Sequence, residues 1–575
     1  MEIKKINAPV AVAGSSLGLL FFFFFFLSVM NADGSLSLVL EWDLTSRVGV
    51  DLSFPLVLDF ISSSFVSVVL YISACVTVFS GFYMSHESFL SRFICLLMSF
   101  VLSMVLLILF PSFLGLMVGW DGLGVTSFLL VVYYMDWDCL SAGMITALSN
   151  RVGDMFFVLG IACMSFSMSY GMVDVFYLKS LFSYTPVLIL GVLIMLGSMT
   201  KSAVMPFSAW LPEAMAAPTP VSSLVHSSTL VTAGVYVLIR FGTVCGAFCS
   251  YFLMAFSLMT VVMAGMSAVS LVDAKKVVAL STLSQVSLMM LAISVGAVGV
   301  AFFHLLVHAF FKALMFLCLG SVIFYSGGVQ DVRFLGSLLL KMPLVFVLLL
   351  ISNLSLVGFP FLSGYYSKEL IVGSCLVGHS SAFMFFLVYL VLVLTFAYSG
   401  RMIWLLCTFQ DVGAVSSYKS ESIHLNTSLL LMSFGAVFSG LVGQSFMIKM
   451  NFFSPVFSLS FWGGLLLVGL WVLNMLVMFW LLEKNLLKEV FLGFVGQLWF
   501  LKPLSGSVTS TFFLSVCRGL MTLLDMGWIR GYVWKGGLKK AFVSSTGYVR
   551  SWNFSPMGVL LFCSMALIWV FLIAI

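Results

Sequence analysis

One stretch decides how the rest of the chain is interpreted: Gly197-Ser-Met-Thr-Lys201-Ser-Ala-Val-Met-Pro206-Phe-Ser-Ala-Trp-Leu-Pro-Glu-Ala-Met-Ala-Ala-Pro-Thr-Pro-Val-Ser-Ser-Leu-Val-His226. It places a lysine, a histidine and four prolines between two apolar runs. Prolines interrupt helices, and interrupted helices occur at membrane depth only where they are buried in protein or line a wet cavity. Because an ionisable residue at that depth indicates function, we expect Lys201, His226 and the helix break at Pro206 to belong to a functional site.

The composition is that of a multi-pass membrane protein. Hydrophobic residues make up 62% of the 575-residue chain and charged residues only 8%, against about 25% charged in soluble domains. A soluble fold is therefore excluded. Fifteen apolar runs are long enough to cross a bilayer: 9–30, 56–80, 89–110, 112–134, 145–168, 185–211, 219–240, 249–271, 276–296, 300–325, 342–373, 381–408, 428–447, 461–482 and 556–575.

Basic residues orient these spans, since Lys and Arg concentrate on the inner side of a membrane. Lys4 and Lys5 begin the chain, and residues 483–550 hold nine Lys or Arg against three Asp or Glu. With fifteen crossings both fall on the inner side, and the acidic loop 31–55 falls outside. The region 483–555 is too polar to span, but its apolar residues recur at helical spacing. This predicts an amphipathic helix lying along the membrane, with a solvated linker as the alternative.

The order of the spans predicts an all-α fold with two five-helix repeats. One span in each unit is interrupted, at Pro206 and at Pro360, which is typical of repeats that meet at a midplane site. Five is odd, so the second unit is inverted. The expected parts are N-terminal helices (1–88), the first repeat (89–240), the second repeat (249–408), two peripheral helices (428–482), the lateral amphipathic segment (483–555) and a C-terminal anchoring helix (556–575).

Ionisable residues inside the expected spans are the candidate site. Each charged side chain costs about 2.5–3.5 kcal/mol at the centre of a membrane helix, so this many indicates partners or use. The main candidates are Asp121, Lys201, His226, His304, His308, Lys312 and Lys368, and the supporting candidates are Arg151, Asp154, Lys276 and Glu369.

Three of these residues form a stripe. His304, His308 and Lys312 recur at i, i+4 and i+8, on one face of a helix. Each step of about 6 Å is longer than a hydrogen bond, so water must bridge them. A polar contact between helices is the alternative. A metal site is disfavoured because Lys312 stands beside the histidines and no carboxylate is near.

Carboxylates near the lysines predict a switch. A neighbouring carboxylate decides whether a buried lysine holds its proton. Asp121 with Lys201, and Glu369 with Lys368 or Lys312, are the candidate pairs.

Other charges have simpler interpretations. Arg151 and Asp154 are three residues apart on one helix, so they alternatively neutralise each other. Lys276 lies beside Asp273 at the inner end of its span, where it alternatively only orients the helix.

Nothing in the sequence predicts a cofactor or a metal on this chain. The eleven cysteines include no Cys-x-x-Cys pair, which leaves iron–sulfur and zinc ligation without support. No glycine-rich dinucleotide fingerprint follows a strand, and no phosphate-binding lysine loop is present. We expect lipids and other membrane subunits as partners, and no nucleic acid.

At these residues the sequence resembles the antiporter-like membrane subunits of respiratory NADH:ubiquinone oxidoreductase, respiratory complex I. Eight motifs in order carry the resemblance: Gly119-Trp-Asp-Gly-Leu-Gly, Asn150-Arg-Val-Gly-Asp, Thr200-Lys-Ser-Ala, Trp210-Leu-Pro-Glu-Ala-Met, Pro218-Thr-Pro-Val-Ser-Ser-Leu-Val-His-Ser-Ser-Thr, Asp273-Ala-Lys-Lys, Ser281-Thr-Leu-Ser-Gln and His304-Leu-Leu-Val-His-Ala-Phe-Phe-Lys-Ala. Gly364-Tyr-Tyr-Ser-Lys-Glu and the basic segment before the last span point to the distal member of that family.

The resemblance implies a proton-translocating subunit of an enzyme that couples NADH oxidation to quinone reduction. It implies Asp121 and Lys201 as a switching pair, His226 as the link onward, and Lys368 as the lysine facing an exit. His304, His308 and Lys312 would form the central relay. NADH, FMN, iron–sulfur clusters and ubiquinone are expected on other subunits. The Phe-, Val- and Met-rich composition favours the mitochondrial inner membrane, with the N-terminus and the lateral segment on the matrix side.

The sequence departs from the family pattern at three points. Asp121 stands where glutamate is usual, which makes its direct reach to Lys201 doubtful. Ala217 replaces a glycine, and one N-terminal span is missing. Two other functions stay open: a subunit of a multi-subunit cation/proton antiporter, and a structural brace whose inner charges only pair with each other.

Overall fold

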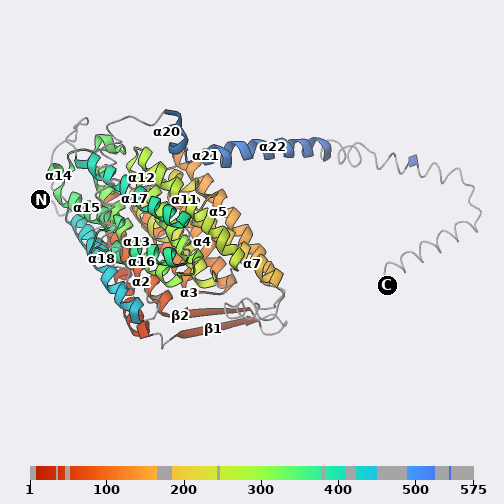
Figure 1. Cartoon of the computed structure of the whole chain (residues 1–575), viewed down its shortest axis with the longest axis horizontal. Coiled ribbons are helices and arrows are strands. Elements are labelled where there is room, and N and C mark those ends of the chain that lie inside the picture. Colours follow the sequence, from red (N-terminus) through yellow and green to blue (C-terminus); the bar gives the residue numbers. More distant parts are fainter. Residues whose placement is uncertain are drawn as a thin grey trace, which may run out of the picture. The chain divides into compact units, whose positions relative to one another are not determined.

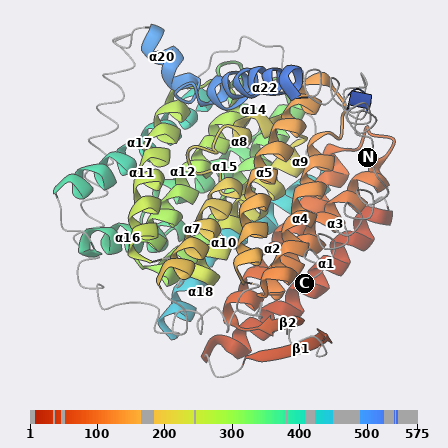
Figure 2. The ribbon, with the colours of Figure 1, turned by 90° about the vertical axis from the view of Figure 1, so that its right-hand side faces the viewer.

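The computed structural model describes residues 8–33, 37–45, 52–164, 184–242, 246–378, 382–407, 422–449 and 489–524, together with 540, 543 and 544. The chain divides into two compact units, residues 1–501 and 502–575. The first unit is a bundle of apolar helices (Figures 1 and 2). Within the described residues, twelve helices of the chain are long and apolar enough to cross a membrane.

Thirteen of the fifteen expected spans coincide with helices. They are α1 (Ala8–Met30), α2 (Phe60–Tyr83), α3 (Leu90–Leu109), α4 (Phe113–Val131), α5 (Trp137–Met164), α7 (Tyr184–Lys201), the composite of α9 (Thr219–Val221), η4 (Ser222–Thr229) and α10 (Leu230–Phe241), α11 (Ala247–Ser270), α12 (Ala274–Ser294), α13 (Val298–Tyr325), the pair α15 (Pro343–Val357) and α16 (Ser363–Gly378), α17 (Ala382–Cys407) and α18 (Ile423–Lys449). The expected spans 461–482 and 556–575 lie outside the described residues.

Both helix breaks occur where the prolines predict them. Helix α7 ends at Lys201, and Pro206 lies in the irregular segment before the short helix α8 (Trp210–Glu213). Helix α15 ends at Val357. The next residue, Gly358, has a left-handed φ of 91°, and its amide N–H donates to Leu354 O at 3.1 Å. Glycine adopts that conformation without strain. Pro360 then separates α15 from α16.

The loop between α1 and α2 contains strands that the all-α expectation did not include. Strands β1 (Leu38–Thr45) and β2 (Leu52–Leu58) form an antiparallel hairpin, with Leu38 opposite Leu58. Figure 1 shows the hairpin at one end of the helix bundle. The pattern is visible in the sequence, since Leu40, Trp42 and Leu44 alternate with polar residues, as in a half-exposed strand.

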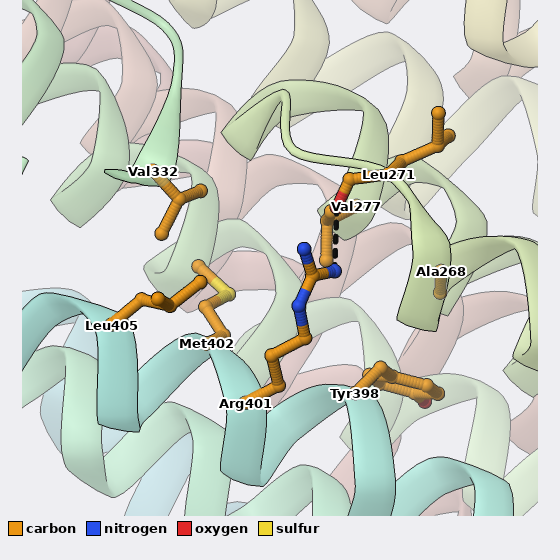
Figure 3. Close-up of a pocket in the computed structure, with 8 residues that line it drawn as sticks. All are labelled: Ala268, Leu271, Val277, Val332, Tyr398, Arg401, Met402 and Leu405. Atoms are coloured by element: carbon orange, nitrogen blue, oxygen red, sulfur yellow. Dashed lines mark hydrogen bonds between the residues drawn. The ribbon is translucent and has the colours of Figure 1, made fainter. Parts of the chain in front are cut away.

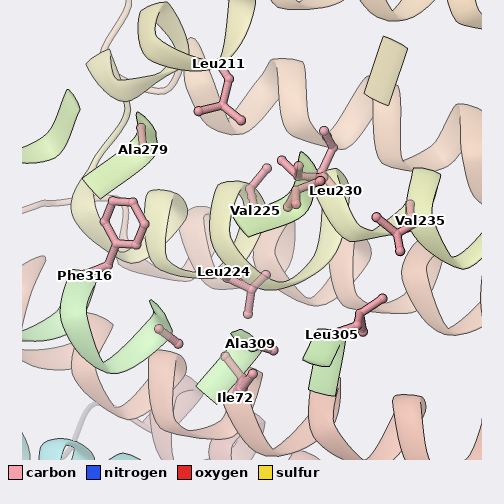
Figure 4. Close-up of a cluster of buried hydrophobic side chains, with 14 of the residues drawn as sticks. Ile72, Leu211, Leu224, Val225, Leu230, Val235, Ala279, Leu305, Ala309 and Phe316 are labelled. Atoms are coloured by element: carbon pink, nitrogen blue, oxygen red, sulfur yellow. The ribbon is translucent and has the colours of Figure 1, made fainter. Parts of the chain in front are cut away.

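Helix α13 is the centre of the bundle. It packs against α2, α12, α15, α16, α18 and η4, and most of its side chains are buried. Figure 4 shows apolar residues of several helices, such as Ile72 of α2 and Ala309 of α13, around Leu224 and Val225 of η4. By contrast, α1 leaves much of its phenylalanine run exposed, as expected of a lipid-facing helix. Charges on α13 and η4 are therefore enclosed by protein.

The expected units of five spans correspond to the helices from α3 to α10 and from α11 to α17. In each unit the fourth span is the interrupted one. That the two units are repeats, and that the second is inverted, stays a prediction.

The end of the chain differs in part from expectation. Helix α20 (Glu489–Gly496) closes the first unit, and helix α22 (Thr509–Leu520) lies in the second. Residues Gly506–Leu524 are apolar and long enough to cross a membrane by length and composition, whereas we expected 483–555 to be too polar. The lateral placement of this segment stays a prediction.

Candidate functional site: buried lysines and histidines along the bundle

The ammonium group of Lys201 is held by Trp120 of α4. Lys201 is fully buried, its Nζ donates to the Trp120 carbonyl oxygen at 2.6 Å, and it lies 3.8 Å from the centre of the Trp120 ring. A cation over an indole face is a favourable electrostatic contact. The lysine therefore has a defined binding place at the point where α7 ends.

Asp121 forms no ion pair with Lys201, which agrees with the doubt about its direct reach, and its role as the switching partner of Lys201 stays a prediction. Successive residues on a helix point about 100° apart, so when Trp120 faces Lys201 its neighbour Asp121 faces elsewhere. One carboxylate oxygen of Asp121 is buried without a hydrogen-bond partner. Asp121 still acts on Lys201 electrostatically, as does Asp154.

Asp154 is the carboxylate that is connected to this site. Its Oδ1 accepts a hydrogen bond from Trp120 Nε1 at 2.8 Å, and its Oδ2 pairs with Arg151 at 3.2 Å. Arg151 is largely exposed and Asp154 largely buried. The predicted Arg151–Asp154 pair is thus confirmed, and the indole of Trp120 joins it to Lys201.

A second tryptophan lies between the Lys201 end of α7 and His226. Trp210 Nε1 donates to Thr200 O at 3.0 Å, and the Trp210 ring centre is 6.1 Å from that of His226. His226 lies on the π-helical segment η4, and neither of its ring nitrogens has a hydrogen-bond partner. Wide helical turns of this kind often occur at functional sites.

His304 is held on both ring nitrogens. Nε2 lies 3.2 Å from Oε1 of Gln285 on α12, and Nδ1 lies 2.9 Å from Oγ of Ser367 on α16. The ring thus bridges the two helices that flank α13 on this side. Ser367 directly precedes Lys368 in the sequence.

The remaining stripe residues have different surroundings. His308 is fully buried, lies 6.2 Å from His304 between ring centres, and has no hydrogen-bond partner. Lys312 Nζ donates to Ser281 Oγ on α12 and lies 4.0 Å from Met315 Sδ. The single helical face that the spacing predicts is consistent with these contacts.

Lys368 closes the chain of buried groups. Its Nζ donates to Thr395 Oγ1 at 2.9 Å and to the carbonyl oxygens of Val357 and Leu356 at 3.2 and 3.3 Å. These carbonyls belong to the last turn of α15, which favours a cation. The expected pairing of Glu369 with Lys368 or Lys312 is wrong, since Glu369 forms no ion pair with either lysine and its Oε1 is buried without a partner.

The two lysines at the start of α12 differ in burial and in their partners. Lys275 is buried and donates to Ala217 O at 3.2 Å, whereas Lys276 is half-exposed and pairs with Asp273 at 3.2 Å. Lys276 therefore lies at the end of the bundle, away from the buried groups, which agrees with an orienting role.

The partners of the buried groups are the residues that the sequence reasoning missed. Trp120, Ser281, Gln285 and Ser367 all lie inside quoted motifs, and Trp120 and Ser367 directly precede the candidate residues Asp121 and Lys368. Their presence in those motifs was the available signal. Within the described residues, no three His, Cys, Asp or Glu side chains are placed to hold a metal ion, and the absence of a metal or cofactor site stays a prediction.

Comparison with known proteins agrees with these motifs. Residues 44–94 match the model for the N-terminus of complex I chain 5, 111–396 that of the NADH:quinone oxidoreductase/Mrp antiporter membrane domain, and 398–575 that of the NADH dehydrogenase subunit 5 C-terminus. NADH-ubiquinone oxidoreductase chain 5 of Anopheles gambiae is 40% identical over 507 residues, which is 85% of each chain. This chain belongs to the NADH-ubiquinone oxidoreductase chain 5 family. The chain 5 protein of Lumbricus terrestris is 38% identical and covers 94% of both chains.

Solved structures support the fold of this chain 5 family member. One chain in the structure of the Mrp complex from Dietzia sp. DQ12-45-1b aligns with a TM-score of 0.75 at 23% identity, over 96% of this chain and 64% of that one. A chain of the membrane-bound sulfane sulfur reductase, an archaeal respiratory membrane complex, aligns with a TM-score of 0.65 at 22% identity, over 78% and 96%. The antiporter-like fold therefore holds across large sequence distances.

Proposed function

We propose that this chain is the proton-translocating, distal membrane-arm subunit of respiratory NADH:ubiquinone oxidoreductase, with other subunits carrying NADH, FMN, iron–sulfur clusters and ubiquinone. The observation that carries the proposal is that Lys201, Lys312 and Lys368 are buried, and none of them has an ion-pair partner in the part of the chain that the structure describes. A buried lysine changes its protonation state readily with neighbouring charge. Three such groups in one bundle fit proton transfer better than static charge pairing.

The proposed relay runs Asp121, Lys201, His226, His304, His308, Lys312 and Lys368. The contacts that connect members of this relay are the Trp210 link from α7 to His226, the packing of η4 against α13, and the contact of His304 with Ser367, the residue before Lys368. Buried polar groups are hydrogen-bonded as a rule, so the bare nitrogens of His226 and His308 favour bridging water. Protonation of one group then shifts the proton affinity of the next.

We place the chain in the mitochondrial inner membrane, with its N-terminus and residues 483–555 on the matrix side. The animal relatives and the distribution of basic residues support this placement. The multi-subunit antiporter is a weaker alternative, because the C-terminal 178 positions match a model specific to NADH dehydrogenase subunit 5. The structural brace is distinguished by experiment.

Replacing Lys312 with methionine tests the proposal. Methionine keeps most of the volume of the side chain and removes the titrating group, so we expect the assembled enzyme to transfer electrons while fewer protons are pumped per electron. Proteoliposomes that report pumping and NADH oxidation together give the measurement. Lys449→Met, at the exposed end of α18, is the matched control. A brace predicts normal pumping by every Lys312→Met enzyme that assembles, and that result would overturn the proposal.

Trp120→Phe separates the two contacts of the first lysine site. Phenylalanine retains an aromatic face for Lys201 and loses the N–H that bonds to Asp154. A hydrogen bond to a charged group contributes about 1.5–3 kcal/mol. The proton pumping that is lost in the Lys312→Met enzyme is the pumping that depends on this chain. We therefore expect this pumping to fall by at least about tenfold in Trp120→Phe. The control is Trp137→Phe, an exposed position on α5; equal pumping by the two variants would show that the Asp154 link is unimportant.

A further inference from the structure

One face of α12 contacts two other helices, α13 and α17, through polar side chains. Ser281 accepts from Lys312 of α13, Gln285 contacts His304 of the same helix, and the Ser284 hydroxyl lies 3.3 Å from the hydroxyl of Tyr398 on α17. Residues 284 and 285 lie three and four positions after residue 281, so the three share one side of the helix. All three are almost fully buried. The α12 face is thus a built polar surface beside the proposed relay.

The Gln285 contact fixes the protonation pattern of His304. An amide oxygen only accepts hydrogen bonds, so His304 Nε2 carries a hydrogen that it donates to Gln285 Oε1. In the neutral ring Nδ1 is then the acceptor and receives the hydroxyl hydrogen of Ser367. The histidine therefore presents its basic nitrogen to α16 and not to α12.

Ser367 can serve both protonation states of the ring. When His304 is neutral, the Ser367 hydroxyl donates to Nδ1. When a proton is added at Nδ1, that N–H donates to Ser367 Oγ, and the hydroxyl hydrogen turns to the carbonyl oxygen of Gly364, which lies 3.4 Å away. One proton is gained at Nδ1, none is lost elsewhere, and Nε2–H stays on Gln285 throughout.

Tyr398 of α17 contacts the same polar face of α12. Its hydroxyl faces Ser284 and the carboxamide of Gln285, and its ring lines a pocket between α11, α12 and α17 (Figure 3). Arg401 also lines this pocket and donates to the carbonyl oxygens of Val269 and Leu271, the latter at 2.6 Å. The Gln285 side chain is therefore confined between Tyr398 and His304.

We propose that Gln285 is a positioning residue of the relay: it holds His304 in the Nε2–H form, so that the ring gains and loses its proton at Nδ1, on the side of α16 and Ser367. This inference rests on the proposed function. It closes the α12 side of His304 to proton exchange, so that exchange with the other groups of the relay uses Nδ1.

Gln285→Met and Gln285→Glu test this role in the assembled enzyme. Methionine matches the length of glutamine and removes the acceptor, whereas glutamate keeps an acceptor oxygen. We expect the pumping that depends on this chain, which is the pumping lost in Lys312→Met, to fall about fivefold in Gln285→Met. That factor corresponds to the loss of one buried hydrogen bond. Gln285→Glu should restore most of it. Electron transfer with an uncoupler should stay normal in both, because a positioning role does not affect the redox reaction.

Matched controls lie on the same helices. Thr282→Val changes a buried α12 residue whose hydroxyl donates to Ala279 O. On α17, Tyr398→Phe should lower the same pumping by a smaller factor than Gln285→Met. Tyr389→Phe is the control for Tyr398→Phe. If Gln285→Met fails to assemble, Tyr398→Phe still tests the arrangement.

Two outcomes separate the levels of inference. Normal pumping by Lys312→Met would overturn the proposed function. A normal Gln285→Met enzyme beside a defective Lys312→Met enzyme would overturn only the role of Gln285, as would equal defects in the methionine and glutamate variants.

Discussion

Enzyme that carries Lys201→Arg should assemble, transfer electrons and still lose the share of proton pumping that this chain supplies. Arginine keeps the positive charge over Trp120 but stays protonated under all accessible conditions. Proton transfer requires that the residue at 201 lose its proton in each cycle. A positioned proton-transfer group contributes about 10²–10⁴-fold to the rate of its step. We therefore expect the pumping that depends on this chain to become undetectable.

Comparison with Lys201→Met makes the experiment decisive. Methionine removes both the charge and the titration, and arginine removes only the titration. A relay predicts that both variants fail, whereas a brace that needs only a cation against Trp120 predicts that arginine restores function. The measurement is protons pumped per electron in proteoliposomes, normalised to assembled enzyme, with Lys449→Arg as the control. Normal pumping by Lys201→Arg would contradict the role of Lys201 as a proton carrier.

The features that were predicted from the sequence are local ones. The breaks at Pro206 and Pro360 follow from the backbone chemistry of proline and glycine. The stripe of His304, His308 and Lys312 follows from the period of the helix. Such signals depend only on residues within a few positions of each other.

The partners of these residues depend on packing and were not predictable in the same way. Lys201 finds Trp120, which is 81 positions away in the sequence, although the adjacent Asp121 is the obvious partner by charge. The direction in which α4 turns its side chains toward α7 decides between the two. The wide turn of η4 at His226 likewise has no local pattern in the sequence.

A largely buried charge pair was also not predicted from the sequence, since its members are 181 positions apart. Arg240, near the end of α10, donates from both terminal nitrogens to the carboxylate of Asp59 at 2.6 and 2.7 Å. Its Nε donates to the Tyr236 hydroxyl at 3.0 Å, and Tyr236 donates to Ile108 O at 2.8 Å. Asp59 also caps the N-terminus of α2. The pair thus ties α2, α3 and α10 together.

Arg240→Ala should destabilise the bundle by about 3 kcal/mol, because removing one partner leaves the other charge largely buried and uncompensated. We choose the low end of the 3–5 kcal/mol range because the Asp59 side chain is 26% exposed, against 7% for Arg240. Asp59→Asn should restore part of the loss, since asparagine removes the stranded charge and still caps α2. The resistance of the purified protein to denaturant in micelles gives the free energies for this double-mutant cycle.

The surface of the same chain offers a matched pair. Arg333 contacts Asp331 at 2.6 Å through the same kind of two-point geometry, but the arginine side chain is 57% exposed. An exposed pair contributes at most about 1 kcal/mol, so Arg333→Ala should cost far less than Arg240→Ala. Equal losses at the two sites would show that burial does not set the strength of the Asp59–Arg240 pair. A large difference, recovered in part by Asp59→Asn, would identify the stranded carboxylate as the cause.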